Sequence, residues 1–536
     1  MTTDSLSETD STCLINIEND QSYPSVVISQ DDAFSDTLLQ AILRARDAFG
    51  RNVTRSVDFR IDQLKKLRKC IDENYEEFVG ALKADFRKPR MESVITEIEY
   101  VKNDIQYQLD HIHEYVKPQH VQKGLANFFD DAYVHYDPYG VVLIFSAWNY
   151  PVQVLLCPLV GAIAAGNCAL IKPSEVASNT EKLFAKLLPQ YLDQDCYHVI
   201  TGGPEEATRM LQERFDLVFF TGSPVVGKIV YNAAAKFMTP VILELGGKSP
   251  VYIDESVGSQ MTVAVKRILW GKLVNAGQTC IAPDYVLCSP DVQDKFIKAA
   301  KEVIADFYKT DPKLSESFAR IINVKNFDRI NSLLSKTTGK VVIGGETDRD
   351  ECYVAPTVVA GVSSSDSLMR EEIFGPILPI VTVDSADEAI AYVNRGEKPL
   401  TMYIFSNKKD VVDRFLARTS SGSTCINDTL MQACVHALPF GGVGNSGIGS
   451  YHGQFSFAAF SHSKAVLAKD YNPVLEFLAA ARYPPYTESN TNRLKLLIAK
   501  SPLDNLNMRK TLSYAFTFGL GLATMLAGVF IYNKYV

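Results

Sequence analysis

The sequence predicts an α/β protein with two or more domains, and three observations lead to this fold class. A chain of 536 residues is longer than a single hydrophobic core supports. From 37 to about 86, apolar residues recur with the period of an amphipathic helix. From about 133 onward, short apolar runs bounded by turn residues alternate with helical stretches, which is typical of parallel sheets covered by helices on both faces.

The predicted strands are short runs that are apolar on both faces. Pro151 and Gly166 indicate the start and the end of a helix between the first two strands. We expect a doubly wound sheet over roughly 133–240 and a second α/β region over 241–430. The runs that predict strands are 141–145, 169–171, 217–220, 241–243 and 251–253.

Two segments follow these regions. Residues 431–480 are rich in Gly and aromatic side chains and show no helical period, so we expect a return segment. Residues 481–511 carry Pro484, Pro485 and Pro502 around a basic stretch, which predicts a linker.

Composition and charge exclude several classes of function. Apolar residues make up 46% of the chain and charged residues 22%, as is usual for a protein that buries large cores. A net charge of −8 without a dense basic tract argues against nucleic-acid binding. The 10 cysteines include no C-x-x-C pair, so we expect reduced thiols, no bound metal and no dithiol redox site.

The N-terminal region carries no targeting signal that we recognise. The first 43 residues contain no Lys or Arg, which excludes a usual secretory signal and an Arg-rich mitochondrial presequence. Residues 1–35 are dominated by Ser, Thr, Asp and Glu, so we expect a disordered arm.

The C-terminal region predicts a membrane anchor. Residues 512–532 are 21 residues without a charge, about 31 Å as a helix, which matches the hydrocarbon core of a bilayer. Arg509 and Lys510 precede this segment, so we expect a tail-anchored transmembrane helix with the folded part on the cytosolic side. The alternative is a buried core helix, but such helices rarely run this long without a polar face.

Two glycine motifs are similar to nucleotide-binding motifs, but each departs from the full pattern. Gly222 to Lys228 fits a phosphate-binding P-loop, except that Ile229 stands where a Ser or Thr would hold Mg²⁺. The backbone at this helix start could still bind a phosphate, because such binding needs only N–H groups. Residues 442–447 match G-x-G-x-x-G without a preceding strand, and we interpret them as a tight loop.

Seven motifs occur in order along the chain: Ser146-Ala-Trp-Asn149-Tyr-Pro151, Ile171-Lys172-Pro-Ser-Glu175, Phe220-Thr-Gly222-Ser223, Glu244-Leu-Gly-Gly-Lys248, Asn275-Ala-Gly-Gln-Thr-Cys280, Glu371-Glu-Ile-Phe-Gly-Pro376 and Pro439-Phe-Gly-Gly442. In this order and at these spacings, they resemble the aldehyde dehydrogenase superfamily over about 36–470, and in particular its class 3 or fatty aldehyde branch. The Arg482-Tyr-Pro-Pro485 link and the predicted membrane span add to the likeness with that branch. Ala276 is a departure, because many relatives carry a second cysteine there.

The resemblance implies a division of the chain into functional parts. It implies a Rossmann-like NAD-binding domain over 36–240, a catalytic domain over 241–430 and an oligomerisation segment over 431–480. It also implies a homodimer.

The resemblance implies that Cys280 is the nucleophile. As a thiolate, it would attack the aldehyde carbon to give a thiohemiacetal and later a thioester. The Asn149 amide and the Cys280 N–H would stabilise the oxyanion, and Glu244 would be the general base for the hydrolytic water. Read alone, Asn149 could instead cap the helix after Pro151, and Glu244 could be a surface carboxylate.

The resemblance also implies the cofactor and part of its site. Lys172 would bond the hydroxyls of the adenosine ribose, with Glu175 beside it. Because a carboxylate there repels the 2′-phosphate of NADP, we expect NAD, while NADP stays possible for class 3 members.

The remaining cofactor residues lie further along the chain. Gly222 and Gly227 would open the helix over which the pyrophosphate lies, with Ser223 close to it. Glu372 would hold the nicotinamide ribose, and Phe374 would pack by the nicotinamide.

The predicted anchor suggests the class of substrate. Each buried methylene contributes about 0.8 kcal/mol, so a long-chain aldehyde partitions into membrane. An enzyme tethered there meets this substrate at high local concentration. We therefore expect oxidation of medium- to long-chain aliphatic aldehydes to fatty acids.

Three alternatives remain open. The anchor could set location only, with small or aromatic aldehydes as substrates. A CoA-acylating dehydrogenase would pass the thioester to coenzyme A, but such enzymes lack a base at the position of Glu244. A membrane-tethered scaffold without activity would not need Asn149, Glu244 and Cys280 together. For the host membrane, we favour the endoplasmic reticulum over the mitochondrial outer membrane, the peroxisome and the lipid droplet.

Overall fold

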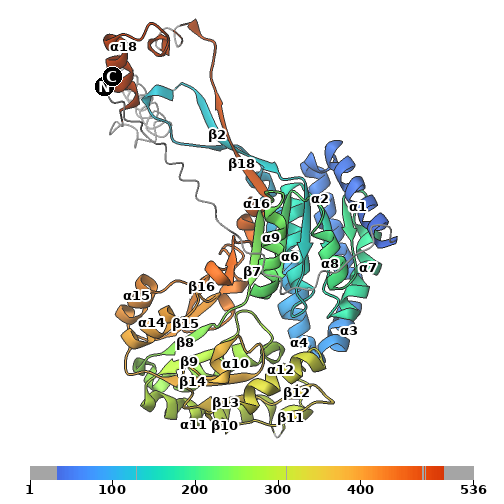
Figure 1. Ribbon diagram of the computed structural model, residues 1–536, viewed down its shortest axis with the longest axis vertical. Coiled ribbons are helices and arrows are strands. Elements are labelled where there is room, and N and C mark those ends of the chain that lie inside the picture. The colour runs from blue at the N-terminus through green and yellow to red at the C-terminus, as the bar shows by residue number, and fades with distance from the viewer. Residues whose placement is uncertain (1–32, 128, 310, 474–475, 477–478, 500–536) are drawn as a thin grey trace, which may run out of the picture.

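The computed structural model describes residues 33–127, 129–309, 311–473, 476 and 479–499, and it contains two mainly parallel sheets flanked by helices (Figure 1). The α/β fold class is confirmed. Of the arm predicted over 1–35, only the last three residues are described, and they begin α1 (Ala33–Gly50). The predicted transmembrane helix over 512–532 lies outside the described residues. Within them, no helix is long and apolar enough to cross a membrane.

The predicted N-terminal helices are confirmed. Their apolar faces, with Leu64, Leu67, Phe78 and Leu82 among the buried side chains, pack against the first domain. The helical elements of this region are α1, η1 (Val53–Arg55), α2 (Val57–Glu73), α3 (Tyr75–Phe86), α4 (Arg90–Ser93), the π-helix η2 (Val94–Ile98) and α5 (Glu99–Tyr115).

The first sheet has the strand order β17-β7-β6-β3-β4-β5, and its neighbouring strands are parallel except at the β17 edge. Its strands are β3 (Val141–Phe145), β4 (Cys168–Lys172), β5 (Tyr197–Val199), β6 (Leu217–Gly222), β7 (Val241–Leu245) and β17 (Gly447–Ile448). Its helices are α6 (Gln153–Ala165), α7 (Ser178–Tyr191), α8 (Pro204–Met210) and α9 (Pro224–Ala235).

The predicted boundary at residue 240 is wrong by a few residues. Strand β7 pairs with β6 along its whole length, so it belongs to the first sheet, and the boundary follows Leu245. The run 241–243 is apolar on both faces in either domain, so its composition alone cannot assign it to a sheet.

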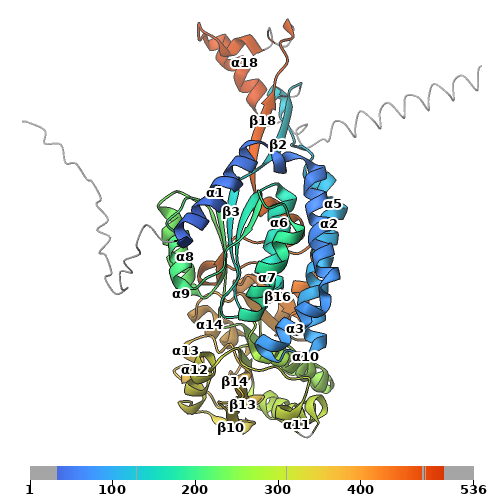
Figure 2. The same cartoon turned by 90° about the vertical axis from the view of Figure 1, so that its right-hand side faces the viewer.

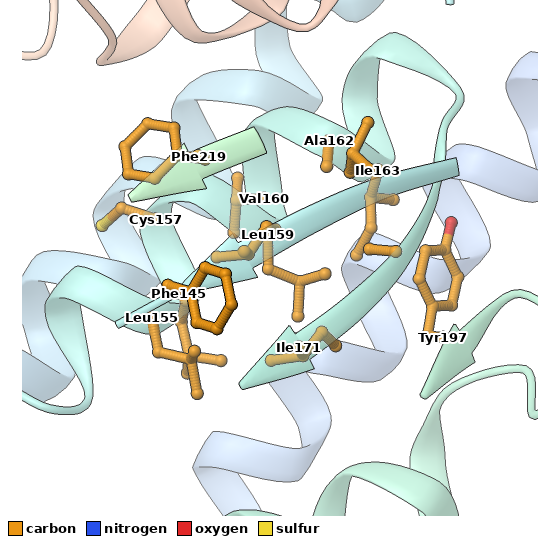
Figure 3. Close-up of a cluster of buried hydrophobic side chains, with 14 of the residues drawn as sticks. Phe145, Leu155, Cys157, Leu159, Val160, Ala162, Ile163, Ile171, Tyr197 and Phe219 are labelled. Carbon is orange, nitrogen blue, oxygen red and sulfur yellow. The ribbon is translucent and has the colours of Figure 1, made fainter. Parts of the chain in front are cut away.

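Helix α6 forms the centre of the first core. Its side chains from Val154 to Ala165 are all buried, between the sheet on one side and α2, α5 and α16 (Gly453–Ala459) on the other. In Figure 3, its apolar side chains gather beside Phe145, Ile171 and Phe219 from three strands. Gly166 ends the helix with φ 91°, a left-handed conformation that glycine adopts without steric strain, as predicted.

The second sheet has the order β10-β13-β14-β9-β8-β15-β16 and is parallel except for β10. Its strands are β8 (Pro250–Ile253), β9 (Tyr285–Cys288), β10 (Lys340–Ile343), β13 (Thr357–Ala360), β14 (Ile377–Thr382), β15 (Thr401–Phe405) and β16 (Ser423–Ile426). The flanking helices are α10 (Met261–Leu273), α11 (Pro290–Tyr308), α12 (Val324–Ser335), α13 (Ser367–Arg370), α14 (Ala386–Arg395) and α15 (Lys409–Arg418). A small hairpin is formed by β11 (Thr347–Asp348) and β12 (Tyr353–Val354).

A three-stranded antiparallel arm projects from the first domain (Figures 1 and 2). It consists of β1 (Gln119–His120), β2 (Asp131–Pro138) and β18 (Ser461–Ala468). Near the far end of the arm lies α18 (Glu488–Ile498), within the segment that the sequence predicts to be a linker. Residues 431–480, predicted to lack helical period, contain the short helices η7 (Met431–Cys434), η8 (Gly444–Ser446) and α16.

Candidate active site

A cavity of about 780 Å³ opens between the two domains, and residues from both line it. It lies where β6 and β7 end, at the carboxyl edge of the first sheet, where ligands bind in open α/β folds. Seven of the ten predicted site residues line this one cavity: Asn149, Gly222, Ser223, Glu244, Cys280, Glu372 and Phe374.

The loop before Cys280 has an unusual backbone conformation. Asn275 and Ala276 have φ angles of 52° and 51°, and Gly277 follows with 75°. Such left-handed conformations cost about 1–2 kcal/mol for a residue with a Cβ. A Cβ at Gly277 would collide with the carbonyl of Gly375. Surrounding contacts therefore have to hold this loop in place.

Gln278 supplies several of these contacts. Its side-chain N–H groups donate to the carbonyls of Asn275 at 2.9 Å and Arg320 at 3.0 Å. Its side-chain oxygen accepts from the N–H of Ile322 at 2.9 Å. The loop is thereby tied to the second domain immediately before the thiol.

Asn149 is 3% exposed, and its side-chain Nδ2 donates to the carbonyl of Gln278 at 3.1 Å. Helix α6 begins with Val152 as its N-cap, so Asn149 is not the helix cap that the sequence left open. An amide group carries two N–H donors, and the bond to Gln278 uses one of them. The second N–H can therefore donate to a ligand oxygen in the cavity.

Glu244 is 2% exposed at the end of β7, which excludes the alternative of a surface carboxylate. Among the described residues, its Oε1 has no hydrogen-bond partner. Burial raises the pKa of Glu244 to about 8, and a contact with the Cys280 thiol partly opposes that rise. A buried carboxyl group with an unused oxygen and a pKa near neutrality is suited to general base catalysis.

Cys280 keeps partial access to the cavity. Loss of hydration raises the pKa of its thiol well above the usual value, and the negative charges of Glu244 and Glu372 raise it further. Without a ligand, both Cys280 and Glu244 therefore favour their protonated forms at neutral pH.

The start of α9 faces the cavity. Ser223 is its N-cap and accepts from the N–H of Val226 at 3.4 Å, with Pro224 at the first helical position. Gly222, Ser223 and Pro224 line the cavity, so the helix N-terminus is placed to bind an anion. Gly227 does not line the cavity: it packs against Leu245, where a Cβ would collide.

Glu372 and Phe374 line the second-domain side of the cavity. The Glu372 carboxylate lies against Gly246, where a Cβ would collide with it. Burial raises the pKa of Glu372 well above its usual value, and Asp284 adds to this rise. Phe374 adopts a left-handed φ of 50° and lies edge-on to Trp148, with ring centroids 5.3 Å apart.

Lys172 and Glu175 lie at the end of β4, outside the set of residues that lines the cavity. The Lys172 Nζ donates to Glu175 at 2.9 Å and to the carbonyl of Pro173 at 3.0 Å. An ammonium group has three N–H donors, so one is left for a ligand hydroxyl.

Several residues that shape the site were not predicted from the sequence. Trp148 and Lys248 stand within the quoted motifs, but nothing there indicated a role. Lys248 forms an ion pair with Asp284 and donates to the carbonyls of Leu368 and Glu371, which orients the segment leading to Glu372. A buried ion pair between Lys88 and Glu97 lies behind the loops of Asn149 and Cys280. Their spacing of nine residues carries no recognisable sequence signal.

Comparisons with known proteins agree on one family. The model of the aldehyde dehydrogenase family matches residues 15–466. Aldehyde dehydrogenase family 3 member B1 of Bos taurus is 50% identical over 459 residues, which cover 86% of this chain and 96% of that protein. Aldehyde dehydrogenase family 3 member A2 of Rattus norvegicus is 46% identical, and the match covers 86% of this chain and 94% of that protein. The substrate-bound structure of Staphylococcus aureus AldH has a TM-score of 0.83 at 40% identity and covers 86% of this chain and 99% of its own.

Proposed function

This chain belongs to the aldehyde dehydrogenase family, and we propose that it oxidises medium- to long-chain aliphatic aldehydes to carboxylic acids with NAD. The observation that carries this proposal is the meeting of Cys280, Glu244 and Asn149 in one cavity with a helix N-terminus. A nucleophile, a buried base and an amide donor are the three groups that aldehyde oxidation through a thioester requires.

The cavity fits a dinucleotide. The N–H groups that follow Pro224 in the first turn of α9, together with Ser223, would hold the pyrophosphate, and Gly222 lines the cavity beside them. Glu372 would hold the nicotinamide ribose, and the ring of Phe374 would pack against the nicotinamide. NAD supplies the acceptor for the hydride that leaves the aldehyde carbon.

The adenosine ribose would be bound further along the sheet edge. Lys172 would donate its remaining N–H to a ribose hydroxyl. The Glu175 carboxylate beside it repels a 2′-phosphate, so NAD is preferred and NADP is accepted less well. Gly227 would act indirectly, by letting α9 pack closely on β7.

The covalent chemistry takes place on Cys280. Its thiol loses a proton to solvent, and the thiolate sulfur bonds to the carbonyl carbon while the C=O electron pair moves to oxygen. The free N–H of Asn149 and the N–H of Cys280 stabilise this oxyanion. After hydride loss, Glu244 in its ionised form takes a proton from water as the water oxygen bonds to the thioester carbon and the carbon–sulfur bond breaks. The acid leaves and the thiolate is regenerated.

Exposed apolar side chains near the catalytic loop support an aliphatic substrate. They lie on α4 and η2, on α10, and on and after η7: Met91, Ile95, Trp270, Met431, Val435 and Leu438. Hydrogen bonds just beyond these elements hold them near one another: Asn275, two residues after α10, donates to Glu92 of α4, and Tyr100, two residues after η2, donates to Ala433 of η7. None of these apolar residues lines the cofactor cavity, so an alkyl chain has a separate apolar surface from which to approach.

The test is a series of NAD-linked assays on straight-chain aldehydes of increasing length and on benzaldehyde. We expect kcat/KM to rise with chain length, because each buried methylene adds about 0.8 kcal/mol. A flat or falling series would favour small or aromatic aldehydes. Cys280→Ser is the control and should form no NADH, which also separates an enzyme from a silent scaffold. Faster turnover on adding coenzyme A would support the acylating alternative.

We further propose that residues 512–532 anchor the protein in a bilayer, with the folded domains facing the cytosol. Their uncharged composition and the preceding Arg509 and Lys510 support this proposal. The endoplasmic reticulum is our first choice of membrane, and carbonate extraction of fractionated membranes tests it. We also propose a homodimer, in which the projecting arm offers a surface for a second copy, and light scattering in detergent measures the mass.

A further inference from the structure

We propose that the buried Lys88 and Glu97 and the partly buried Glu92 form a clamp that sets the position of Asn149 relative to Cys280. The three residues are positioning residues, because none of them lines the cavity. They lie within one short segment that runs from the end of α3 through α4 into the π-helix η2. This inference rests on the proposed function, since it assigns these residues a role in the same reaction.

Glu97 holds the segment that follows Asn149. Its Oε2 accepts hydrogen bonds from the N–H groups of Val152 at 2.8 Å and Gln153 at 3.4 Å. These are the first orphan donors of α6, and in the described structure this helix start has no side-chain cap of its own. A carboxylate at a helix N-terminus is also favoured by the helix dipole. Glu97 therefore fixes the N-cap residue of α6, Val152, three residues after Asn149.

Lys88 connects this capping site to the loop of Cys280. Its Nζ donates to the Oε1 of Glu97 at 2.5 Å, and both side chains are fully buried. The same Nζ lies 4.0 Å from the centroid of the Tyr150 ring, within range of a cation–π interaction. The Tyr150 hydroxyl hydrogen bonds to that of Thr279 at 2.8 Å, and Thr279 precedes Cys280.

Glu92 contacts the other end of the same loop. Its carboxylate accepts from the backbone N–H of Asn275 at 2.8 Å, at the first of the three left-handed residues. Burial raises the pKa of Glu92 to about 7, while the bond from Asn275 and the charge of Lys88 oppose this rise. The clamp thus touches the Asn149 segment at Val152 and the Cys280 loop at Asn275 and, through Tyr150, at Thr279.

A structural role alone explains this arrangement poorly. A buried ion pair often adds little net stability, because its attraction has to offset the desolvation of both charges. Here each charged group also bonds or packs against a residue within a few positions of the oxyanion donor or the nucleophile. A π-helix, which is frequent at functional sites, supplies Glu97. Orientation of the two catalytic loops accounts for all of these contacts.

The test compares variants of the full-length protein in the pre-steady state. Lys88→Met and Glu97→Ala should slow the burst of NADH by about 100-fold, the loss expected for a misplacement near 1 Å. KM for NAD should stay within about twofold, because the clamp does not touch the cofactor site. Glu97→Gln keeps an acceptor for Val152 but loses the charge, so its burst rate should lie between those of Glu97→Ala and the wild type.

Lys102→Met is the matched control. Lys102 pairs with Asp72 of the neighbouring helix α2 at 2.9 Å and with Glu99 of its own helix α5 at 3.0 Å, and it does not line the cavity. The Lys102→Met variant should keep the wild-type burst rate, while a change in its melting temperature measures the loss of the ion pairs. The proposal is wrong if folded Lys88→Met and Glu97→Ala match this control in burst rate. If neither folds, Glu97→Gln decides, and a wild-type burst rate there contradicts the clamp. A wild type that forms no NADH would instead contradict the proposed function.

Discussion

The side-chain amide of Asn275 donates a hydrogen bond of 2.8 Å to the backbone carbonyl of Asn149. Asn149 follows β3 of the first sheet, whereas Asn275 follows α10 of the second domain, so this bond crosses between the domains. The same Nδ2 also donates to the carbonyl of Gln278 at 3.1 Å. One amide group thereby joins the proposed oxyanion donor to the loop of the proposed nucleophile.

Asn275→Ala should lower kcat, and the fall should be larger than the loss of stability alone would cause. The substitution removes both amide donors and leaves a buried carbonyl without its partner, a loss of about 1–3 kcal/mol. It also keeps a residue with a Cβ at a left-handed φ, so the loop is expected to relax and move Cys280. We expect kcat/KM for aldehyde to fall by about 10- to 100-fold. Steady-state NADH formation and thermal melting measure the two effects.

Asn427→Ala is the matched control for this prediction. Asn427 has a φ of 57°, and its side chain bonds the backbone of Ser406 at 2.9 and 3.1 Å. Its loss should destabilise the protein by a similar amount without a fall in kcat, because it does not line the cavity. Equal falls in kcat for both variants would show that Asn275 acts through stability alone.

Glu244→Gln should separate the two halves of the reaction. Deacylation needs a base, so we expect a burst of NADH followed by steady-state turnover about 100- to 10,000-fold below the wild type. Above about pH 8, where Glu244 is ionised, the substitution also removes a negative charge beside Cys280, so the thiol pKa should fall and alkylation by iodoacetamide at this pH should quicken. Stopped-flow fluorescence and mass spectrometry follow the two events. Unchanged steady-state turnover would contradict the role of base.

The sequence predicts the parallel sheets well, because central strands need apolar residues on both faces. The run 141–145 coincides with β3, and Gly166 ends α6 as expected. The boundary near 240 was misplaced, because the pairing of β7 with β6 depends on residues far apart in the chain. Local composition carries no information on such pairing.

The cavity residues were recognised through motifs, but their supports were not. Lys88, Glu92 and Glu97 look like ordinary surface charges in the sequence, since charged side chains are seldom buried. Nothing about Ala276 indicates a left-handed backbone, because alanine normally avoids it. Both features depend on contacts between residues far apart in the chain, such as Glu97 with Val152 and Glu92 with Asn275, which no local pattern encodes.

The stability of the protein should depend on pH through Glu244. Its pKa is raised to about 8 in the folded state from its ordinary value of 4.5, so between these values the folded state binds the additional proton. The stabilisation that protonated Glu244 contributes to the folded state is fully present below its pKa in the unfolded chain. It is lost as the pH rises toward about 8. Glu244→Gln lacks this loss, so its melting temperature should exceed that of the wild type more at pH 8.5 than at pH 5. A difference that does not change with pH would contradict the raised pKa.

Removal of the Glu175 carboxylate should relax the choice between NAD and NADP. The side chain pairs with Lys172 at 2.9 Å, and in the proposed cofactor site it would repel a 2′-phosphate. For Glu175→Gln, the ratio of KM for NADP to KM for NAD should fall by about 10-fold, equivalent to about 1.4 kcal/mol of relieved repulsion. Glu77→Gln is the control, because Glu77 forms a Lys–Glu pair of similar length with Lys186 at 2.7 Å, outside the cavity. If both variants keep the wild-type ratio, repulsion by Glu175 does not set the preference, and the bonding of Lys172 to the ribose hydroxyls would have to account for it.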